Sequence, residues 1–356
     1  MSESKSRINS IDVVRGLAMV LMAIDHVRVY SGLPAGGPTA GTFFTRWVTH
    51  FCAPAFCFFA GTSAYLYGRK LNDTPRLARY LIQRGLILVL LELTVIRFSW
   101  TFNFDYAHFT LAGVIWMLGW CMVLLAALVW LPANVVGIVG VVIIVAQQLV
   151  PRVLPHAWPF AFIYPMGVDP PDGIWILYVI VPWIGVMAVG YGFGLIVERP
   201  RLCLIIGLTA TALFLLLGYL SHPTSLFQLL NQRKYPASPA FLLMTLGPTI
   251  ALLPLAERWR GWCGDVLATF GRVPMFYYLL HIPTIHLAAL AVNFIRTGSP
   301  HQGWYVSAPG AQVPPEQRWT LPLLYLVFAI VVTALYFPCR WFARVRVQRG
   351  GWLRYL

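Results

Sequence analysis

The long apolar runs of this chain constrain its fold more than any other feature of its sequence. Ten runs are long enough to cross a lipid bilayer, and they lie near residues 11–30, 51–67, 80–96, 111–131, 135–150, 174–197, 202–220, 240–256, 266–295 and 320–338. Glycine and proline occur within several runs, as is common in membrane helices that contact one another. The pattern predicts an all-α, polytopic membrane helix bundle with about ten transmembrane helices, in which residues 1–356 form a single transmembrane domain.

The charged residues support this prediction and indicate an orientation. Of the 356 residues, 59% are hydrophobic and 11% are charged, whereas soluble domains carry about 25% charged residues. The net charge of +14 comes largely from short basic clusters beside the apolar runs, which are typical of membrane topology signals rather than of nucleic-acid binding. If the N-terminus is cytoplasmic, sixteen lysines and arginines fall on the inner side and eight on the outer side. We therefore expect both termini in the cytoplasm, membrane lipids as neighbours and no nucleic-acid partner.

The cysteines and the N-terminus exclude some other classes. The six cysteines lie within apolar runs or at their ends, with no CxxC pair and no Cys/His spacing typical of a metal site. We expect neither disulfides nor a bound metal. The polar N-terminus, residues 1–10, opens into the first run without a small-residue cleavage site, so we expect the first helix to be retained.

The first predicted helix carries the most informative candidate residues. Arg15 and His26 are eleven positions apart, so they return to nearly the same helix face with about 16 Å of rise between them. One interpretation is an anion-binding group near the inner end and a proton-transfer group near the outer end. The alternative is that Asp12 and Arg15 form a structural pair and that Arg15 reaches the headgroups. His26 lies well inside the run beside Asp25, where ionisable groups usually have a function.

The start of the second predicted helix brings another histidine to the same end. His50 follows the short loop that returns from the first helix, so we expect His26 and His50 to be near neighbours. Two imidazoles at one mouth can act as a base and its orienting partner. The alternative for His50 is an interfacial residue at a helix start.

The ninth predicted helix adds a candidate catalytic residue, His281. Tyr277 and His281 are four residues apart and share a face, whereas His281 and His286 are five apart with Pro283 between them, a poor spacing for ligands of one metal. The structural alternative is a tyrosine, Tyr277 or Tyr278, that donates to a histidine in the core.

Glu92, in the third predicted helix, also has two interpretations. With the loop residues Asp105 and His108, it would complete a polar site at the outer face. The structural interpretation, which we expect, is an ion pair between Glu92 and an arginine such as Arg97.

Several segments, taken in order, resemble a known family. Residues 11–61, with Asp12-x-x-Arg15-Gly16 at their start, His26 and the segment 54–61, resemble the heparan-α-glucosaminide N-acetyltransferase-like membrane proteins, which include bacterial members. The segments 178–194, 234–238, 271–286 and 336–340 are similar to later parts of that family. The resemblance implies a transmembrane acyltransferase, expected in a bacterial inner membrane, that moves an acetyl group from cytoplasmic acetyl-CoA to a sugar or glycan acceptor at the outer face.

The resemblance and the first-helix pattern together give expected roles to individual residues. Arg15 and Arg272, near the inner mouth, would attract the phosphates of acyl-CoA. His26, helped by His50 or Asp25, would deprotonate the hydroxyl or amine of the acceptor.

The chain departs from the family at this point. By this resemblance, the position of His26 corresponds to an asparagine in the lysosomal enzyme of the family. That enzyme carries its proposed catalytic histidine in the following loop. This chain has no histidine between Val27 and Thr49, so we expect His26 to take over that role.

Two other function classes fit the same residues. A carrier for a small molecule or a lipid-linked sugar would use the polar residues as a binding site without covalent chemistry, and broken helices with polar groups fit a transporter. A structural or regulatory membrane subunit would tolerate replacement of all of them. Helix contacts through Gly61 and residues 190–194 would support a homodimer.

Overall fold

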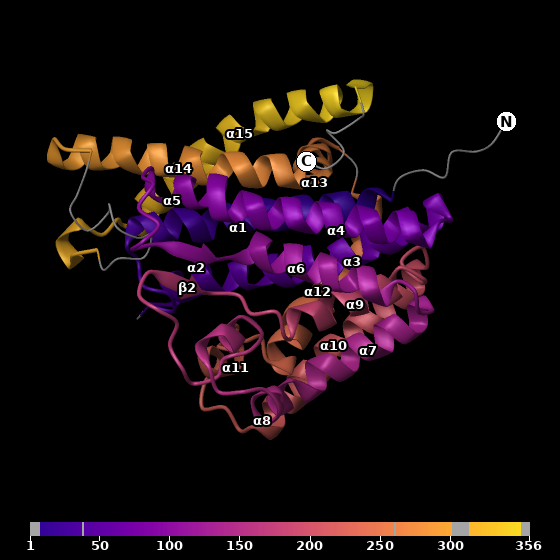
Figure 1. The fold of residues 1–356 in the computed structure, drawn as a ribbon. Coiled ribbons are helices and arrows are strands. Elements are labelled where there is room, and N and C mark those ends of the chain that lie inside the picture. Colours follow the sequence, from indigo (N-terminus) through magenta and orange to yellow (C-terminus); the bar gives the residue numbers. More distant parts are fainter. Residues whose placement is uncertain (1–7, 38, 260, 301–312, 350–356) are drawn as a thin grey trace.

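The computed structural model describes residues 8–37, 39–259, 261–300 and 313–349, and these form an almost entirely helical protein (Figure 1). The helices are α1 (Asn9–Ser31), α2 (Ala40–Trp47), α3 (Cys52–Leu71), α4 (Thr74–Leu91), α5 (Arg97–Thr101), α6 (Val114–Leu128), α7 (Ala133–Ala146), α8 (Val150–Val153), α9 (Trp183–Phe193), α10 (Pro200–Leu220), α11 (Leu226–Leu230), α12 (Pro239–Arg258), α13 (Trp262–Arg272), α14 (Pro274–Thr297) and α15 (Leu321–Arg349). The described residues also form four 3₁₀-helices, η1 (Val48–Phe51), η3 (Gln147–Leu149), η4 (Trp158–Phe162) and η5 (Pro315–Gln317), and one π-helix, η2 (Glu92–Ile96). Their two strands are β1 (Thr110–Ala112) and β2 (Ile174–Ile176). The all-α prediction is confirmed for the described residues, apart from these two three-residue strands.

Several helix ends follow directly from local sequence. α4 begins after Asp73, whose carboxylate accepts a hydrogen bond from the backbone N–H of Arg76, and Pro75 occupies its first turn. α1 and α14 end at Gly32 and Gly298, whose φ angles of 72° and 74° favour glycine. These signals fix the ends of the two helices that carry His26 and His281.

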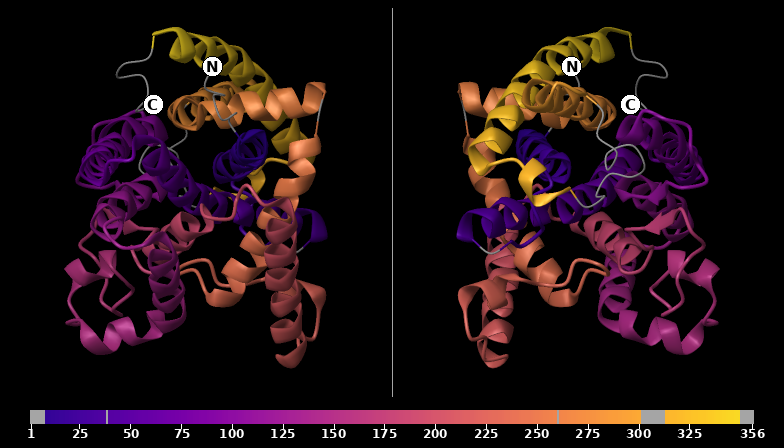
Figure 2. Two further views of the ribbon diagram at one scale, coloured as in Figure 1. Left: turned by 90° about the vertical axis from the view of Figure 1, so that its right-hand side faces the viewer. Right: turned by 90° about the vertical axis from the view of Figure 1, so that its left-hand side faces the viewer.

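The helix α1 lies at the centre of the bundle. It contacts α3, α12, α13, α14 and α15. Figure 2 shows the indigo helix with the orange and yellow C-terminal helices on one side and the magenta helices on the other. Around it, α4 packs on α6, α7 on α9 and α10 on α12. The polar residues of α1 therefore face protein rather than lipid, which is the arrangement that a membrane protein requires of them.

Five helices are long and apolar enough to cross a membrane, by length and composition: Ala133–Val153, Pro200–Leu220, Pro239–Arg258, Pro274–Thr297 and Leu321–Arg346. Only 17–22% of the apolar window is buried inside the protein in the first, second and last of these spans. Their large apolar faces are suited to contact with lipid, and the chain is an integral membrane protein. The prediction of about ten crossings and of two cytoplasmic termini remains a prediction.

Several of the predicted runs are not single helices, and two of them are interrupted next to a proline. The run at 174–197 begins with the strand β2, and its helix starts only at Trp183, after Pro182. The run at 266–295 is divided into α13 and α14 at Val273, which precedes Pro274. A residue before proline is disfavoured in the helical region, and hydropathy alone does not separate a short strand from a helix.

Glycines allow two helix pairs to approach closely. A Cβ on Gly61 would lie 1.9 Å from the carbonyl oxygen of Met187, and one on Gly190 would lie 2.0 Å from that of Phe58, because α3 and α9 cross there. Gly192 faces Gly137 of α7 in the same way. These glycines make close helix contacts within the chain, and the homodimer stays a prediction.

The two strands form a small parallel sheet outside the long helices. Thr110 is opposite Ile174 and Ala112 is opposite Ile176. The sheet ties the segment before α6 to the segment before α9 and so positions two stretches of non-helical chain beside α1.

Candidate functional site

A cavity of about 340 Å³ lies beside the second half of α1. Its aromatic and apolar wall comes from several elements, and its acidic, basic and histidine lining residues are Asp25, His26, Arg28, Arg46, Glu92 and Lys234. The volume is near the lower end of the range of about 300–1,000 Å³ that is usual for small-molecule sites. An apolar wall with a few convergent polar groups is typical of a ligand site.

His26 and His281 form a hydrogen-bonded pair at this cavity. His26 Nδ1 lies 2.6 Å from His281 Nε2, and the two rings stack at 4.8 Å between centroids. His281 is fully buried on α14, and its Nδ1 lies 2.6 Å from the carbonyl oxygen of Tyr278. The topology thus brings together two residues that are 255 positions apart in sequence.

The Tyr278 carbonyl determines which nitrogen carries each proton. A carbonyl oxygen only accepts, so His281 Nδ1 is the donor to it, and the neutral ring then has an accepting Nε2. His26 Nδ1 must therefore donate to His281 Nε2, and His26 Nε2 is left without a proton. Since His26 lines the cavity, this nitrogen is suited to take a proton from a bound ligand.

Asp25 holds two arginines at the wall next to His26. Its two carboxylate oxygens lie 3.0 Å from Arg28 Nε and 2.9 Å from Arg46 Nη1. Arg28 also donates to the carbonyl of Leu33, and Arg46 to the hydroxyl of Thr49. Burial lowers the pKa of Arg46, on α2, but the Asp25 carboxylate together with Tyr235 and Tyr178 raises it more, so the net shift is upward. Asp25 therefore orients the arginines, while the hydrogen bond of His26 is made to His281.

Lys234 adds a third cation to the same wall. Its side chain is 7% exposed and lines the cavity. The ammonium lies 5.8 Å from the ring centroid of Tyr178 and 5.2 Å from that of Tyr235. Within the described parts of the chain, it has neither a carboxylate partner nor a hydrogen bond. The Asp25 carboxylate, which lines the same cavity, also attracts this ammonium without forming an ion pair with it.

Glu92 does not pair with Arg97, and the predicted ion pair between them is wrong. Its carboxylate instead accepts hydrogen bonds from the backbone N–H groups of Ile115 and Trp116, at 3.0 and 3.1 Å. These groups lie in the first turn of α6, where N–H groups lack helical partners and favour a negative charge. Sequence could not show this preference, because both partners are backbone atoms.

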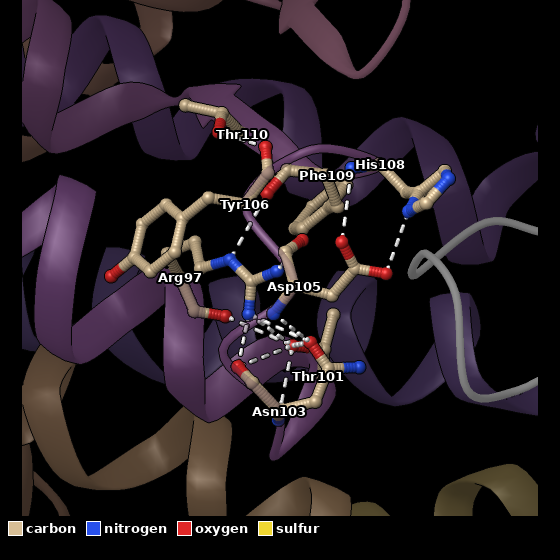
Figure 3. A network of polar contacts seen from close by, with 8 residues as sticks. All are labelled: Arg97, Thr101, Asn103, Asp105, Tyr106, His108, Phe109 and Thr110. Atoms are coloured by element: carbon tan, nitrogen blue, oxygen red, sulfur yellow. Dashed lines mark hydrogen bonds and ion pairs between the residues drawn. The ribbon is translucent and has the colours of Figure 1, made fainter.

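Arg97 organises the loop before β1 (Figure 3). The side chain is 1% exposed, and it donates to the carbonyls of Asn103, Asp105 and Phe109, with 3.0 Å from Nε to the last. Its guanidinium also lies over the ring of Tyr106 at 4.6 Å. Because Phe109 lines the cavity, Arg97 fixes part of the wall.

The predicted polar site of Glu92, Asp105 and His108 is not formed. Asp105 and His108 pair with each other at 2.7 Å in an exposed loop, and neither lines the cavity that Glu92 reaches. The hydrogen bond from His108 lowers the pKa of the Asp105 carboxyl.

His50 and Tyr277 are buried near the site, but neither makes the hydrogen bond that the sequence interpretation gave it. His50 does not line the cavity, and its Nδ1 has no hydrogen-bond partner among the described residues. The centroid of its ring lies 5.4 Å from that of Phe241. The partner that orients His26 is therefore His281 rather than His50. Tyr277 stacks on His281 at 5.4 Å, but its hydroxyl donates to no atom of the described chain.

Arg15 and Arg272 meet where α1 crosses α13. Arg15 pairs with Asp12 at 2.7 Å, as one interpretation of the sequence predicted, and it also donates to the carbonyl of Gly271, with 2.7 Å from Nε. Arg272 follows that glycine and has an exposed side chain. The two arginines thus lie at one junction, about 16 Å of helix rise from His26.

Neither Lys234 nor Arg46 was predicted as a site residue, although residues 234–238 are among the segments that resemble the family. Both lie in segments between the long apolar runs, where basic residues are ordinarily topology signals. Only the fold shows that they turn inward. Across the described ranges, no cluster of three or more His, Cys, Asp or Glu side chains is arranged to hold a metal ion.

A comparison with protein families places the chain. The family model described as heparan-alpha-glucosaminide N-acetyltransferase, catalytic, matches residues 7–233. The match includes His26, Arg46 and Glu92, whereas Lys234 and His281 lie beyond it. No curated protein matches the chain.

Proposed function

Because the chain belongs to the heparan-alpha-glucosaminide N-acetyltransferase catalytic family, a group of transmembrane acetyltransferases, we propose that it transfers an acetyl group from cytoplasmic acetyl-CoA to a sugar-like acceptor across a bacterial inner membrane. The observation that carries the proposal is the His26–His281–Tyr278 chain, which ends at an imidazole nitrogen free to accept a proton inside a cavity. A carrier performs no proton transfer with its ligand, so it does not need an imidazole nitrogen that is held ready to accept a proton.

His26 is the general base of the proposed reaction. Its Nε2 takes a proton from the acceptor hydroxyl or amine as that group attacks the thioester carbonyl. The imidazolium then returns the proton to the departing thiolate, so the products are the acetylated acceptor and CoA thiol. A base positioned in this way contributes about 10²–10⁴-fold to the rate.

His281 is the positioning residue. It accepts the hydrogen bond of His26 Nδ1 and so fixes the ring orientation and tautomer that leave Nε2 available. Asp25 keeps Arg28 and Arg46 in place, and its role is to shape the wall beside the base.

We place the donor at the opposite end of α1. Arg272, with its exposed side chain, is suited to bind a CoA phosphate, and Arg15 holds the backbone at that junction through Gly271. The thioester end of the donor would then extend along α1 toward His26.

The test is transfer of radiolabelled acetyl from acetyl-CoA, supplied at the cytoplasmic face of sealed vesicles, to acceptors on the other side. We expect His26→Gln to lower the transfer rate by about 10²–10⁴-fold while acetyl-CoA still binds. His108→Gln, which changes a histidine outside the cavity, is the matched control and should behave as wild type. Full activity of His26→Gln would show that His26 is not the general base. If the wild-type protein binds acetyl-CoA but consumes no thioester, the protein is a carrier rather than an acetyltransferase.

A further inference from the structure

The indole of Trp100 lies against the ring of the proposed base. Its ring centroid is 5.1 Å from that of His26, and the two planes meet at 78°. Trp100 belongs to the short helix α5 and lines the same cavity as His26. A group that binds against His26 inside the cavity therefore meets this indole as well.

The indole N–H of Trp100 has no acceptor within the part of the chain that the structure describes. Trp100 takes part in hydrogen bonds there only through its backbone, whose carbonyl oxygen accepts from the hydroxyl of Tyr30 at 2.9 Å. The residue is only 7% exposed, yet its indole nitrogen is not enclosed by protein as that of Trp47 is, so it is reached from the cavity. A buried indole N–H usually has a partner, and here a bound ligand would supply it.

Two residues that the proposed reaction does not use hold Trp100 in this place. Tyr30 of α1 donates to the Trp100 carbonyl and stacks on the indole at 5.7 Å between centroids. On α14, Nδ1 of His286 lies 3.0 Å from the carbonyl oxygen of Ser99, and the ring of His286 stacks on Tyr30 at 5.0 Å. The helix α5 is thus fixed by the same two helices that carry the histidine pair. A donor held in this way is preorganised, as the stabilisation of a developing oxyanion requires.

The basic residues of the cavity lining are less suited to this task. Arg28 and Arg46 share one carboxylate, and Lys234 lies beside tyrosine rings and is attracted by that same carboxylate. Among the lining residues that the structure describes, Trp100 is the side-chain N–H donor whose ring contacts that of His26.

We propose that Trp100 is a catalytic residue of the acyl transfer, whose indole N–H donates to the carbonyl oxygen of the acetyl thioester and stabilises the oxyanion that forms there. The assignment rests on the proposed function. As the acceptor attacks, its proton passes to His26 Nε2, its oxygen or nitrogen bonds to the carbonyl carbon, and the π electrons of the carbonyl move to the oxygen that Trp100 binds. The carbonyl then re-forms as the carbon–sulfur bond breaks, and the thiolate takes the proton from His26.

The first measurement is the steady-state kinetics of Trp100→Phe, which removes the N–H and keeps an aromatic ring, with D-glucosamine as the probe acceptor. Loss of one oxyanion donor costs about 10²–10³-fold in kcat, and we expect that fall with little change in KM for acetyl-CoA. Trp319→Phe, which changes a buried tryptophan outside the cavity, should keep the wild-type kcat. A wild-type kcat in Trp100→Phe, or a higher KM at unchanged kcat, refutes the assignment.

The second measurement needs no turnover. Infrared spectra are recorded of acetyl-CoA, labelled with ¹³C at the acetyl carbonyl and bound to the detergent-solubilised full chain without an acceptor. A hydrogen bond weakens the C=O bond, so the labelled stretch should lie at lower frequency in wild type and Trp319→Phe than in Trp100→Phe. Equal frequencies in wild type and Trp100→Phe would show that the indole does not bind the thioester.

A second variant covers the case in which Trp100→Phe does not fold. Tyr30→Phe removes the hydrogen bond that holds the Trp100 carbonyl, so it should raise the carbonyl frequency and lower kcat, and a wild-type frequency and kcat in Tyr30→Phe would then refute the assignment. If wild type shows the lowered frequency but transfers no acetyl group, the proposed function fails while the contact between Trp100 and the thioester stands.

Discussion

Replacement of Gly16 by alanine tests the crossing of α1 and α13 that carries Arg15. A Cβ on Gly16 would lie 1.8 Å from the carbonyl oxygen of Leu267 and 3.1 Å from the backbone nitrogen of Gly271. Real Cβ contacts stay beyond 3.0 Å, so the helices must separate by at least about 1.2 Å. The obstacle is backbone and has no rotamer that would relieve it.

The expected loss in free energy of unfolding is about 1.5–5 kcal/mol. Overpacking of this kind costs about 1–3 kcal/mol, and the separation also weakens the charged hydrogen bonds from Arg15 to Gly271, worth about 1.5–3 kcal/mol. The helix propensity of alanine returns about 1 kcal/mol.

The assay is unfolding of the detergent-solubilised protein by increasing SDS, followed by circular dichroism. Gly137→Ala on α7 is the matched control, because its Cβ would meet nothing closer than the Cα of Gly192 at 3.3 Å. It gains the same helix propensity, and its contact at 3.3 Å requires a shift of only a few tenths of an ångström. If Gly16→Ala unfolds at the same SDS fraction as Gly137→Ala, the close crossing of α1 and α13 is incorrect.

Two further substitutions test the site. Arg97→Met leaves the carbonyls of Asn103, Asp105 and Phe109 without their donor, so we expect limited proteolysis to cut residues 102–109 faster than in wild type; an unchanged cleavage pattern would show that the loop holds without it. His281→Phe keeps an aromatic ring but removes the acceptor for His26 Nδ1, so we expect kcat to fall by up to about 10²–10⁴-fold and the pH–rate profile to shift, with little change in KM. A drop in protein yield with an unchanged pH–rate profile would assign His281 a structural role.

The parts of the fold that follow from hydropathy were predictable, because long apolar runs have few solutions in a bilayer. The runs that became α1, α10 and α12 were placed within a few residues of their ends. The helix boundaries next to Pro182 and Pro274 were not predicted. The average hydropathy of a window does not show that a single proline restricts the backbone of the residue before it.

The site was predictable on one helix and not across helices. Helical periodicity placed Arg15 and His26 on one stripe of α1, and the Asp12–Arg15 pair follows from their spacing. The partner of His26 depends on how α14 packs on α1, a contact between residues far apart in sequence. Glu92 and Arg97 bind backbone atoms, and no side-chain pattern identifies such partners.

The lining of the cavity comes from two kinds of structure, and this affects how such a protein can change. The base and its partner stand on α1 and α14, in the middle of the bundle, where nearly any substitution disturbs packing. Another part of the lining comes from chain outside the long helices, including β2 and the Lys234–Tyr235 pair. Residues there can be exchanged at small cost in stability. One set of reactive groups can therefore serve different acceptors in different relatives, and an engineer who wants a new acceptor should vary residues 174–178 and 234–235 first.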